Sequence, residues 1–300
     1  MYRKNIDLKH PHDSFFRRLL SHLRRLRLFI EYCLSAELLE HLDLSDLVIV
    51  NDVFVDNELK KYFSDLLCKT KFRGEQAYLY ILFEHKSHPD KDVAFQLLKY
   101  MVKIWDRERT SSDEKLPLII PIVVYHGKEE WRIGTNFSNM QNIRSEVFER
   151  YALYFEYVLI NLSAYNDNKV IDDLALSFGL SLLKHIFDEP EKILSMLLKH
   201  KDLLLELVLE DEEFLRTSIL YLSTTDVDRG KLADIFENNL PSQGRSLVMS
   251  LCQSLLEEGR KEAQYKIAKQ LLIEGISVQT IKKSTGLSEK EIRKLKSEIS

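Results

Sequence analysis

A nearly continuous apolar run, "LPLIIPIVVY" at residues 116–125, limits the possible folds more than any other part of the sequence. It is about half the length that a helix needs to cross a bilayer, and Pro121 interrupts it. A short apolar run rich in β-branched residues is typical of a strand that is buried on both faces. The run therefore predicts a strand inside an α/β sheet rather than a membrane span.

The periodicity of the apolar residues predicts the elements around this strand. Helical spacing across residues 14–42 predicts one long helix, whereas a period of two across residues 44–86 predicts three short strands. A helix is expected over about 92–109 and a further strand at 157–162. After about residue 166 only helical patterns remain. The sequence thus predicts an α/β half followed by an all-α half.

Composition places the chain among globular proteins, with 45% hydrophobic and 30% charged residues in a length of 300. The net charge of −4 gives no overall nucleic-acid signal. Residues 17–27 nevertheless hold five arginines, and residues 259–300 carry ten Lys or Arg against five Glu. Between them, residues 203–214 are acidic and are expected to contact protein. Each basic stretch is either a phosphate-binding surface or an ordinary solvated helix face.

The cysteines and the N-terminal residues predict a cytoplasmic protein with no membrane partner. Cys33, Cys68 and Cys252 are far apart and form no CxxC pair, which favours a reducing compartment over a disulfide framework. The first residues, "MYRKNIDLKHPHDS", contain no apolar stretch of the secretory type.

The predicted strand "YLYILFEHK" (78–86) ends in an acid and a base. Because side chains alternate along a strand, Glu84 and Lys86 share one face, roughly 7 Å apart. If the preceding strand pairs with it through a turn at residues 71–76, Asp65 comes close to Glu84. Two adjacent carboxylates repel unless a cation lies between them, and Mg²⁺ is the natural choice. Solvated strand ends or ordinary salt bridges remain the alternative explanation.

Several motifs resemble one bacterial family. Asp65 followed by Glu84-His85-Lys86 is similar to the PD-(D/E)XK nuclease signature, and Gln96-x-x-x-Tyr100 resembles its accessory QxxxY element. The wider context resembles the recombination-promoting nuclease family, also described as putative transposases, over roughly residues 8–250. The motifs that carry this resemblance are "PHDSFFRRLLS", "SDLLCK", "LFEHKSHPDKDVAFQLLKYMVKIW" and "PIVVYHGKEEW".

The resemblance implies a restriction-endonuclease-like α/β fold, in which a mixed sheet is flanked by helices. Together with the pattern of elements, it predicts a nuclease core at residues 1–165, a helical region at 166–256 and a basic helix–turn–helix-like tail at 257–300. The implied activity is Mg²⁺-dependent cleavage of double-stranded DNA, with Mn²⁺ or Ca²⁺ as alternative ions. The implied role is in recombination, including horizontal transfer, or in defence against foreign DNA.

The same resemblance assigns roles to the matching residues. Asp65 and Glu84 would hold the metal and Lys86 would be the catalytic lysine. Gln96 would orient the metal-bound water or a substrate phosphate, and Tyr100 would support Gln96 or touch the DNA backbone. Two departures are Ser64 in place of the signature proline and Cys68 where a tyrosine is expected; the second is expected to affect packing. The competing hypothesis is a non-catalytic DNA-binding or regulatory protein on a nuclease-like scaffold.

Two further stretches have functional and structural interpretations. After the buried strand, Tyr125, His126 and Lys128 either contact phosphate or form a turn held by the packing of Tyr125 and Trp131. In the N-terminal region, Asp13 and Glu37 are candidates for an additional acid at the metal site, although Asp13 most simply caps a helix.

The C-terminal residues 266–299 predict a small helical unit. A helix ends at Gly275, a short helix follows, and Gly286 supplies a turn before the capping box Ser288–Glu291 opens a third helix. Basic side chains lie on this last helix: Lys290, Arg293, Lys294 and Lys296. The unit either binds DNA or serves as a tail for protein interaction. A homodimer through the C-terminal helical half is also expected, because a double-strand cut is easiest for two copies.

Overall fold

The structure is a computed structural model that describes residues 10–50, 66–84, 89–109, 111, 115–143, 145–165, 171–239, 250, 253 and 264–299. The side chains of residues 82–84, 205, 208, 209 and 297–299 are not described. The chain forms two compact units, residues 1–226 and 227–300. The first unit contains the sheet, the N-terminal helices and helices α5 to α8.

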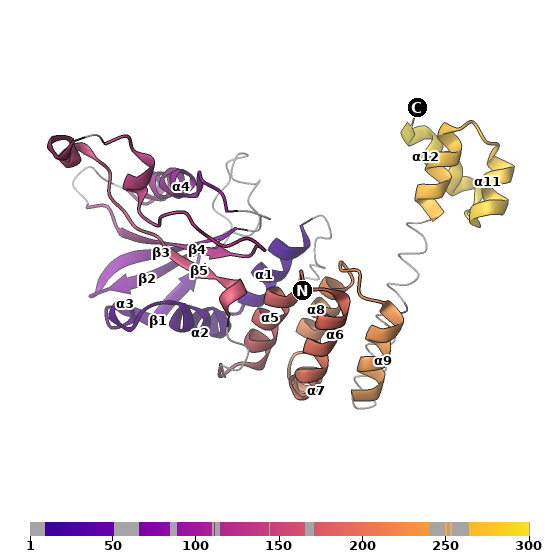
Figure 1. The fold of residues 1–300 in the computed structure, drawn as a ribbon, viewed down its shortest axis with the longest axis horizontal. Coiled ribbons are helices and arrows are strands. Elements are labelled where there is room, and N and C mark those ends of the chain that lie inside the picture. Colours follow the sequence, from indigo (N-terminus) through magenta and orange to yellow (C-terminus); the bar gives the residue numbers. More distant parts are fainter. Residues whose placement is uncertain are drawn as a thin grey trace. The chain divides into compact units, whose positions relative to one another are not determined.

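One mixed sheet organises the first unit (Figure 1). The strands lie side by side in chain order; β2 is antiparallel to both of its neighbours, β1 and β3, whereas β3, β4 and β5 are parallel. This confirms the predicted mixed sheet flanked by helices. The strands are β1 (Leu42–Ile49), β2 (Leu66–Phe72), β3 (Glu75–Glu84), β4 (Leu118–Tyr125) and β5 (Val158–Asn161).

A two-residue turn sets the register of the β2–β3 hairpin. Arg73 and Gly74 both have positive φ, +49° and +85°, as tight hairpin turns with the twist of the strands require. Phe72 therefore lies opposite Glu75, and Leu66 lies opposite Ile81. As a result, β2 begins at the same edge of the sheet at which β3 ends, as the sequence predicted.

The apolar run forms β4, and its side chains from Pro121 to Tyr125 are buried. Helix α4 (Val93–Glu108) covers one face of the sheet, while α2 (Leu23–Cys33) and α3 (Ala36–Leu39) lie on the other side (Figure 1). Strand β5 pairs with β4 only from Ile122 onward, so Pro121 lies where β4 has one neighbouring strand and its missing N–H is tolerated. The prediction of a strand buried on both faces is confirmed.

The prediction of one helix over residues 14–42 is wrong. The chain forms α1 (Pro11–Leu20), α2 and α3 instead, and β1 already begins at Leu42. His22 and Leu34 have extended backbone between these helices, and the Ser35 side chain caps α3 by accepting a hydrogen bond from Leu38 N. Separate short helices follow the sheet better than one straight helix, because each can turn its apolar side chains inward.

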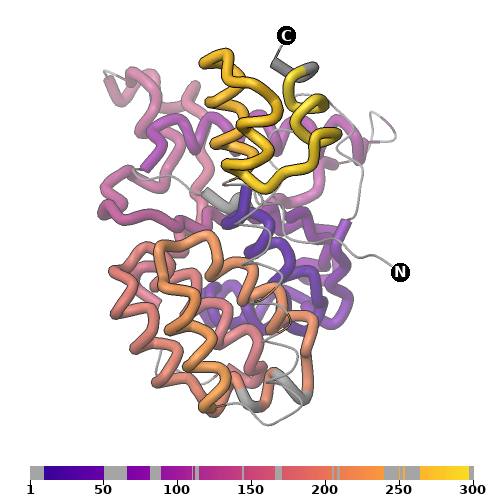
Figure 2. Tube along the Cα trace, turned by 90° about the vertical axis from the view of Figure 1, so that its right-hand side faces the viewer, coloured from indigo at the N-terminus to yellow at the C-terminus, as the bar shows by residue number. Residues whose placement is uncertain are grey.

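Four helices continue the first unit after the sheet, and they confirm the predicted helical half. Helix α1 packs against α5 and α8, as Figures 1 and 2 show from two directions. The contact is close, because a Cβ added at Gly179 would lie 2.6 Å from Leu19 Cδ1 and 3.1 Å from Phe214 Cζ. The helices are α5 (Leu174–His185), α6 (Pro190–Lys199), α7 (Lys201–Glu210) and α8 (Glu212–Leu222).

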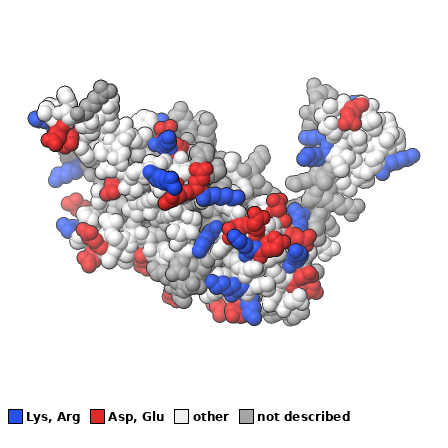
Figure 3. All heavy atoms as spheres, viewed as in Figure 1, with Lys and Arg blue, Asp and Glu red and all other residues white. Residues whose placement is uncertain are grey.

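Ion pairs join the basic stretch at residues 17–27 to acidic residues of the same unit. Arg25 binds both Asp173 and Asp211, and Arg18 Nη2 lies 2.8 Å from Glu213 Oε1. Arg18 and Arg25 of the basic stretch are therefore paired within the chain, and Asp211 and Glu213 of the acidic stretch are two of their partners. Contacts of the acidic stretch with another protein remain a prediction. Among the described residues on the face shown in Figure 3, positive and negative side chains are likewise interspersed.

The second unit contains the predicted C-terminal helices. A helix over residues 264–273 ends before Gly275, whose φ is +77°, and Gly286 (φ +74°) separates the two helices that follow. Ser288 Oγ accepts a hydrogen bond from Glu291 N, while Ser288 N donates to Glu291 Oε2 at 2.8 Å, so the predicted capping box is confirmed. The helices with named bounds are α9 (Arg229–Asn239), α11 (Val278–Thr285) and α12 (Glu289–Ile299).

Candidate active site

The candidate site is the edge of the sheet at which β3 ends. Glu84 is the last residue of β3 and pairs with Tyr125, the last residue of β4, which in turn pairs with Asn161 of β5. Strand β2 begins at this edge with Leu66. The carboxyl ends of three parallel strands therefore meet here, where polar groups that follow the strands can be brought together.

Two of the predicted site residues lie outside the described part of the chain. Asp65 directly precedes β2, and Lys86 follows β3 by two residues. Glu84 is described as a position at the end of β3, without its side chain. Within the described residues no group of three or more His, Cys, Asp or Glu side chains is arranged to hold a metal ion. The side chains of the predicted metal ligands, Asp65 and Glu84, lie outside the described residues, so this finding does not apply to them.

Helix α4 brings Gln96 and Tyr100 over the same sheet. The C-terminal part of α4 lies at the other end of β3, since the Tyr78 hydroxyl donates a hydrogen bond to Glu108. The ring of Tyr100 contacts that of Tyr80, with centroids 5.1 Å apart. Because α4 runs antiparallel to β3, Gln96 lies one turn nearer to the Glu84 edge.

Gln96 has an unusual environment for an amide side chain. Its Nε2 atom is buried and has no hydrogen-bond partner among the residues that the structure describes. A buried amide without a partner costs about 1–3 kcal/mol, so such a group calls for an explanation, such as a bound ion, water or ligand. Tyr100, which is 6% exposed, packs against Tyr80 and supports the helix turn that carries Gln96.

Cys68 replaces an expected tyrosine, and the structure supports the predicted packing role. Its side chain is fully buried in β2, next to Leu67, which belongs to the cluster under α4. Because neighbouring strand residues point to opposite faces, Cys68 faces away from that cluster. Burial raises the pKa of its thiol to about 12, so the thiolate needed for metal binding or nucleophilic attack is disfavoured.

The turn after β4 packs inside the protein. The Tyr125 ring is fully buried and lies edge-on to Trp131, with centroids 4.9 Å apart, which confirms the structural interpretation of this turn. His126 Nε2 donates a hydrogen bond to the Leu183 carbonyl oxygen at 2.7 Å, and a carbonyl acceptor requires that this nitrogen carries the proton. His126 thus connects the end of β4 to α5, and Tyr125 packs on Trp131, so both side chains are engaged inside the protein.

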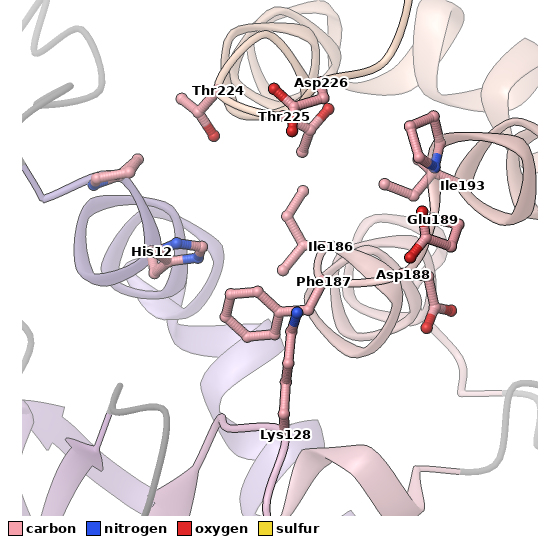
Figure 4. Close-up of a pocket in the computed structure, with 12 residues that line it drawn as sticks. His12, Lys128, Ile186, Phe187, Asp188, Glu189, Ile193, Thr224, Thr225 and Asp226 are labelled. Atoms are coloured by element: carbon pink, nitrogen blue, oxygen red, sulfur yellow. The ribbon is translucent and has the colours of Figure 1, made fainter.

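Lys128 remains exposed and borders a pocket of about 350 Å³ beside α1 (Figure 4). Its Nζ lies 5.7 Å from the centre of the Phe187 ring. Figure 4 shows Thr224 and Asp226 at the top of this pocket, across from Lys128, with Asp188 and Glu189 at its right-hand side. Acidic side chains outnumber Lys128 here, so the pocket does not have the chemistry of a phosphate site.

The structure separates the two additional acids. Glu37 is exposed on α3, directly before the start of β1, whose Leu42 pairs with Phe72 at the turn of the β2–β3 hairpin. Glu37 therefore lies at the opposite end of the sheet from Glu84 and does not join the candidate site. Asp13 lies in the first turn of α1, whose N-cap is His10, so its predicted capping role is wrong.

A contact between α1 and α8 was missed by the sequence analysis. His12 Nδ1 and the Tyr221 hydroxyl form a hydrogen bond of 2.5 Å, and burial together with the charge of Asp13 raises the Tyr221 pKa well above its usual value. The two residues are 209 positions apart, so no local pattern indicates the pair. This contact, like that of His126, belongs to the packing of α1 and the sheet against the helices.

The C-terminal unit presents its basic residues to solvent. Ile281, Leu287 and Ile292 hold its helices together in a small apolar core. On α12, Arg293 forms an ion pair of 2.7 Å with Glu289, while Lys290 and Lys294 are exposed. Exposed lysines on the last helix of a helix–turn–helix unit are suited to contact phosphates.

Two family models match the chain. The model described as "Putative transposase, YhgA-like" covers residues 10–214, which include the whole sheet and most of the helices packed on it. The model described as "Rpn/YhgA-like nuclease family, C-terminal HTH domain" covers residues 261–297. The second match identifies residues 261–297 as a helix–turn–helix domain.

Curated relatives from Escherichia coli (strain K12) carry nuclease names, but not all are active. Recombination-promoting nuclease RpnC is 28% identical over 258 residues, 83% of this chain and 82% of RpnC. Recombination-promoting nuclease RpnA is 25% identical over 284 residues, 94% of this chain and 96% of RpnA. The "inactive recombination-promoting nuclease-like protein RpnE" is 24% identical over 297 residues, again 94% and 96%.

No solved structure matches this chain. No helix in the described residues is both long and apolar enough to span a bilayer.

Proposed function

Because the chain belongs to the YhgA-like putative transposase family of recombination-promoting nucleases, we propose that it is a metal-dependent DNA endonuclease. The observation that best supports this proposal is that the described elements next to the signature residues lie at the same edge of the sheet. Strand β2 begins there directly after Asp65, and β3 ends there at Glu84. Helix α4 carries Gln96 toward this edge, and the buried Nε2 of Gln96 has no partner within the described part of the chain.

The chemistry of these residues fits a hard divalent cation. Asp65 and Glu84 offer carboxylate oxygens, which Mg²⁺ prefers together with waters and phosphate oxygens. When bound, the ion would lower the pKa of a water and neutralise charge on the phosphate. The unpartnered amide of Gln96 can donate a hydrogen bond to that water or to a phosphate oxygen.

The remaining residues have positioning and electrostatic roles in this proposal. Lys86 supplies a positive charge to the hydroxide or to the pentacovalent transition state. Tyr100 keeps the Gln96 turn of α4 in place through its contact with Tyr80. Because Tyr100 is buried, this supporting role is favoured over direct contact with the DNA backbone.

Removal of the metal or of Asp65 tests the proposal. Wild-type protein is expected to nick supercoiled plasmid with Mg²⁺ and to lose this activity with EDTA, with recovery when excess Mg²⁺ is added. Asp65→Ala should be inactive in Mg²⁺ yet bind DNA with unchanged affinity, because the mutation removes a ligand and leaves the C-terminal domain intact. Cleavage is measured on agarose gels. Equal cleavage by the wild type and Asp65→Ala would show that Asp65 is not part of the active site.

The competing proposal is a DNA-binding protein without cleavage. It gains support from the similarity to RpnE, which is named inactive. Calorimetry separates the two: uptake of Mg²⁺ or Mn²⁺ by the wild type but not by Asp65→Ala supports the enzyme. DNA binding without metal uptake or cleavage supports the alternative.

The C-terminal domain is proposed to bind double-stranded DNA through α12. Removing Lys290 and Lys294 together should weaken binding about tenfold at low salt and reduce the slope of log affinity against log salt by about two, one per lost phosphate contact. The measurement is fluorescence anisotropy with a labelled duplex, in the Asp65→Ala background. The matched control removes two exposed lysines of the helix over residues 264–273, Lys266 and Lys269. Equal losses in both double variants would contradict a specific role for α12.

A further inference from the structure

The chain between β4 and β5 forms an arm, residues 135–157, with an apolar surface at its tip (Figure 1). Six large apolar side chains there are between 41% and 76% exposed, with Tyr151 at the upper limit. Contiguous exposed apolar surface of this kind commonly marks an interaction site. We call these residues the arm surface; they are Met140, Val147, Phe148, Tyr151, Leu153 and Tyr154.

The arm is firmly attached to the sheet. At its base, Tyr157 N donates to Thr135 O and Phe137 N donates to Phe155 O, so the two sides of the arm are paired. The Phe137 and Phe155 rings stack with centroids 5.1 Å apart, and Phe137 belongs to the core cluster beneath α4. The exposed residues therefore sit on an ordered support.

A second fastening lies next to the arm surface. The Gln141 side chain donates to Leu153 O at 2.7 Å and accepts from Leu153 N at 3.1 Å, as a neighbouring strand would. These two hydrogen bonds hold Gln141, the residue after Met140, next to Leu153. Phe148 and Tyr151 are three residues apart in the 3₁₀ helix Glu146–Tyr151, where side chains at this spacing align. The arm surface is thus gathered at the tip.

The charges around the arm surface fit a second copy of this chain. In the sequence the arm holds three Glu and two Arg, which does not favour a phosphate backbone. Glu146 and Arg150 lie at equal distances in sequence on either side of Phe148. If two 3₁₀ helices cross antiparallel at Phe148, each Arg150 meets Glu146 of the other copy, as a two-fold symmetric contact requires. We propose that the arm surface is a homodimer interface with this arrangement.

The exposed area is consistent with a stable contact. With about 200 Å² for a whole aromatic side chain, the three exposed rings offer roughly 400 Å² per copy. Two copies would thus bury about 800 Å² from the rings alone, against about 1,200 Å² for the smallest stable interfaces. The aliphatic side chains of the arm surface supply the remaining area.

The arm surface lies away from the candidate active site. Strand β5 begins at Val158, opposite Ile122 in the middle of β4, and the arm enters from the side of Leu118 rather than Tyr125. The interface and the Glu84 edge are therefore at opposite ends of the sheet. The inference goes beyond the proposed nuclease function and differs from the dimer expected through the C-terminal half.

The test measures the mass of the full chain by sedimentation equilibrium over a range of concentrations. Wild type is expected to dimerise, and Phe148→Glu should weaken the dimer at least about tenfold, as loss of a central aromatic contact does. The matched control is Val102→Glu, which places the same charge at an exposed apolar position of α4. A wild type that is monomeric at every concentration overturns the proposal, and so does a dimer that Phe148→Glu leaves unchanged.

Charge reversal tests the antiparallel arrangement separately. Glu146→Arg and Arg150→Glu should each weaken the dimer, and their combination should restore it. In addition, Phe148→Cys, in a background with Cys33 and Cys252 replaced by serine, should cross-link to itself with a short bis-maleimide. Failure of both the rescue and the cross-link overturns the arrangement. Because the readouts are mass and cross-linking, loss of nuclease activity in a parallel assay would not affect this result.

Discussion

Replacing Glu84 with glutamine is expected to slow plasmid nicking in Mg²⁺ by about 1,000-fold. The substitution keeps the size of the side chain but removes the negative charge and one strong oxygen ligand for the cation. Removal of a single preorganised group at a phosphoryl-transfer site commonly costs two to three orders of magnitude in rate. The expected result follows from the position of Glu84 at the carboxyl end of β3, beside β4.

The same strand supplies a matched control. Glu75 is the first residue of β3, is exposed, and lies at the hairpin end of the sheet. Glu75→Gln changes the charge and composition of the protein in the same way, and we expect wild-type nicking rates. Single-turnover rates on plasmid DNA provide the measurement. If both variants lose nicking rate to a similar extent, the loss comes from the change in net charge of the protein and not from the position of Glu84.

Replacing Arg25 with methionine is expected to lower the free energy of unfolding by about 3 kcal/mol. Arg25 is 12% exposed and bridges two carboxylates, Asp173 and Asp211, which are 10% and 26% exposed. Its guanidinium also lies 5.1 Å from the centre of the Phe214 ring. Breaking a buried ion pair from one side leaves the other charges uncompensated, and typical losses are 3–5 kcal/mol.

The two aspartates limit the loss to the lower end of this range. Each caps a helix, because Asp173 Oδ1 accepts from Leu176 N at 2.8 Å and Asp211 Oδ1 accepts from Phe214 N at 2.9 Å. These bonds continue to stabilise the carboxylates when Arg25 is absent.

Arg24→Met is the control for this prediction. Arg24 is the neighbouring residue and contacts Asp172 at 3.4 Å, but both side chains are largely exposed. Exposed ion pairs contribute little, so we expect a change below about 0.5 kcal/mol. Urea unfolding followed by circular dichroism compares the two variants, which carry the same net charge. A smaller loss for Arg25→Met than for Arg24→Met would contradict the bridging role.

The sheet was predictable because its signals are local. Alternating side chains, the turn at Gly74 and the apolar run of β4 define the strands within short windows of sequence. The C-terminal helices were equally predictable from Gly275, Gly286 and the capping box at Ser288. The breaks in the N-terminal helices were not, since neither Gly nor Pro marks His22 or Leu34.

Contacts between distant segments could not be predicted from local patterns. The partners of Arg25 lie 148 and 186 positions away, and the charge of the basic stretch alone does not indicate them. For the candidate site, the i, i+4 spacing predicted that Gln96 and Tyr100 lie one turn apart on a helix, and both residues lie on α4. The unpartnered Nε2 of Gln96 depends on packing that only the fold reveals. The roles of Asp65, Glu84 and Lys86 remain predictions.

The stacking of α1 on α8 has a consequence for how this protein can be divided. Phe15 lies parallel to Tyr221 with ring centroids 4.3 Å apart, and both side chains are fully buried. A fragment that stops after β5 would expose the apolar face of α1 to solvent, and we expect it to aggregate during expression. The sheet and these helices are therefore expected to fold as one unit, so the sheet could be transferred to another protein only together with them.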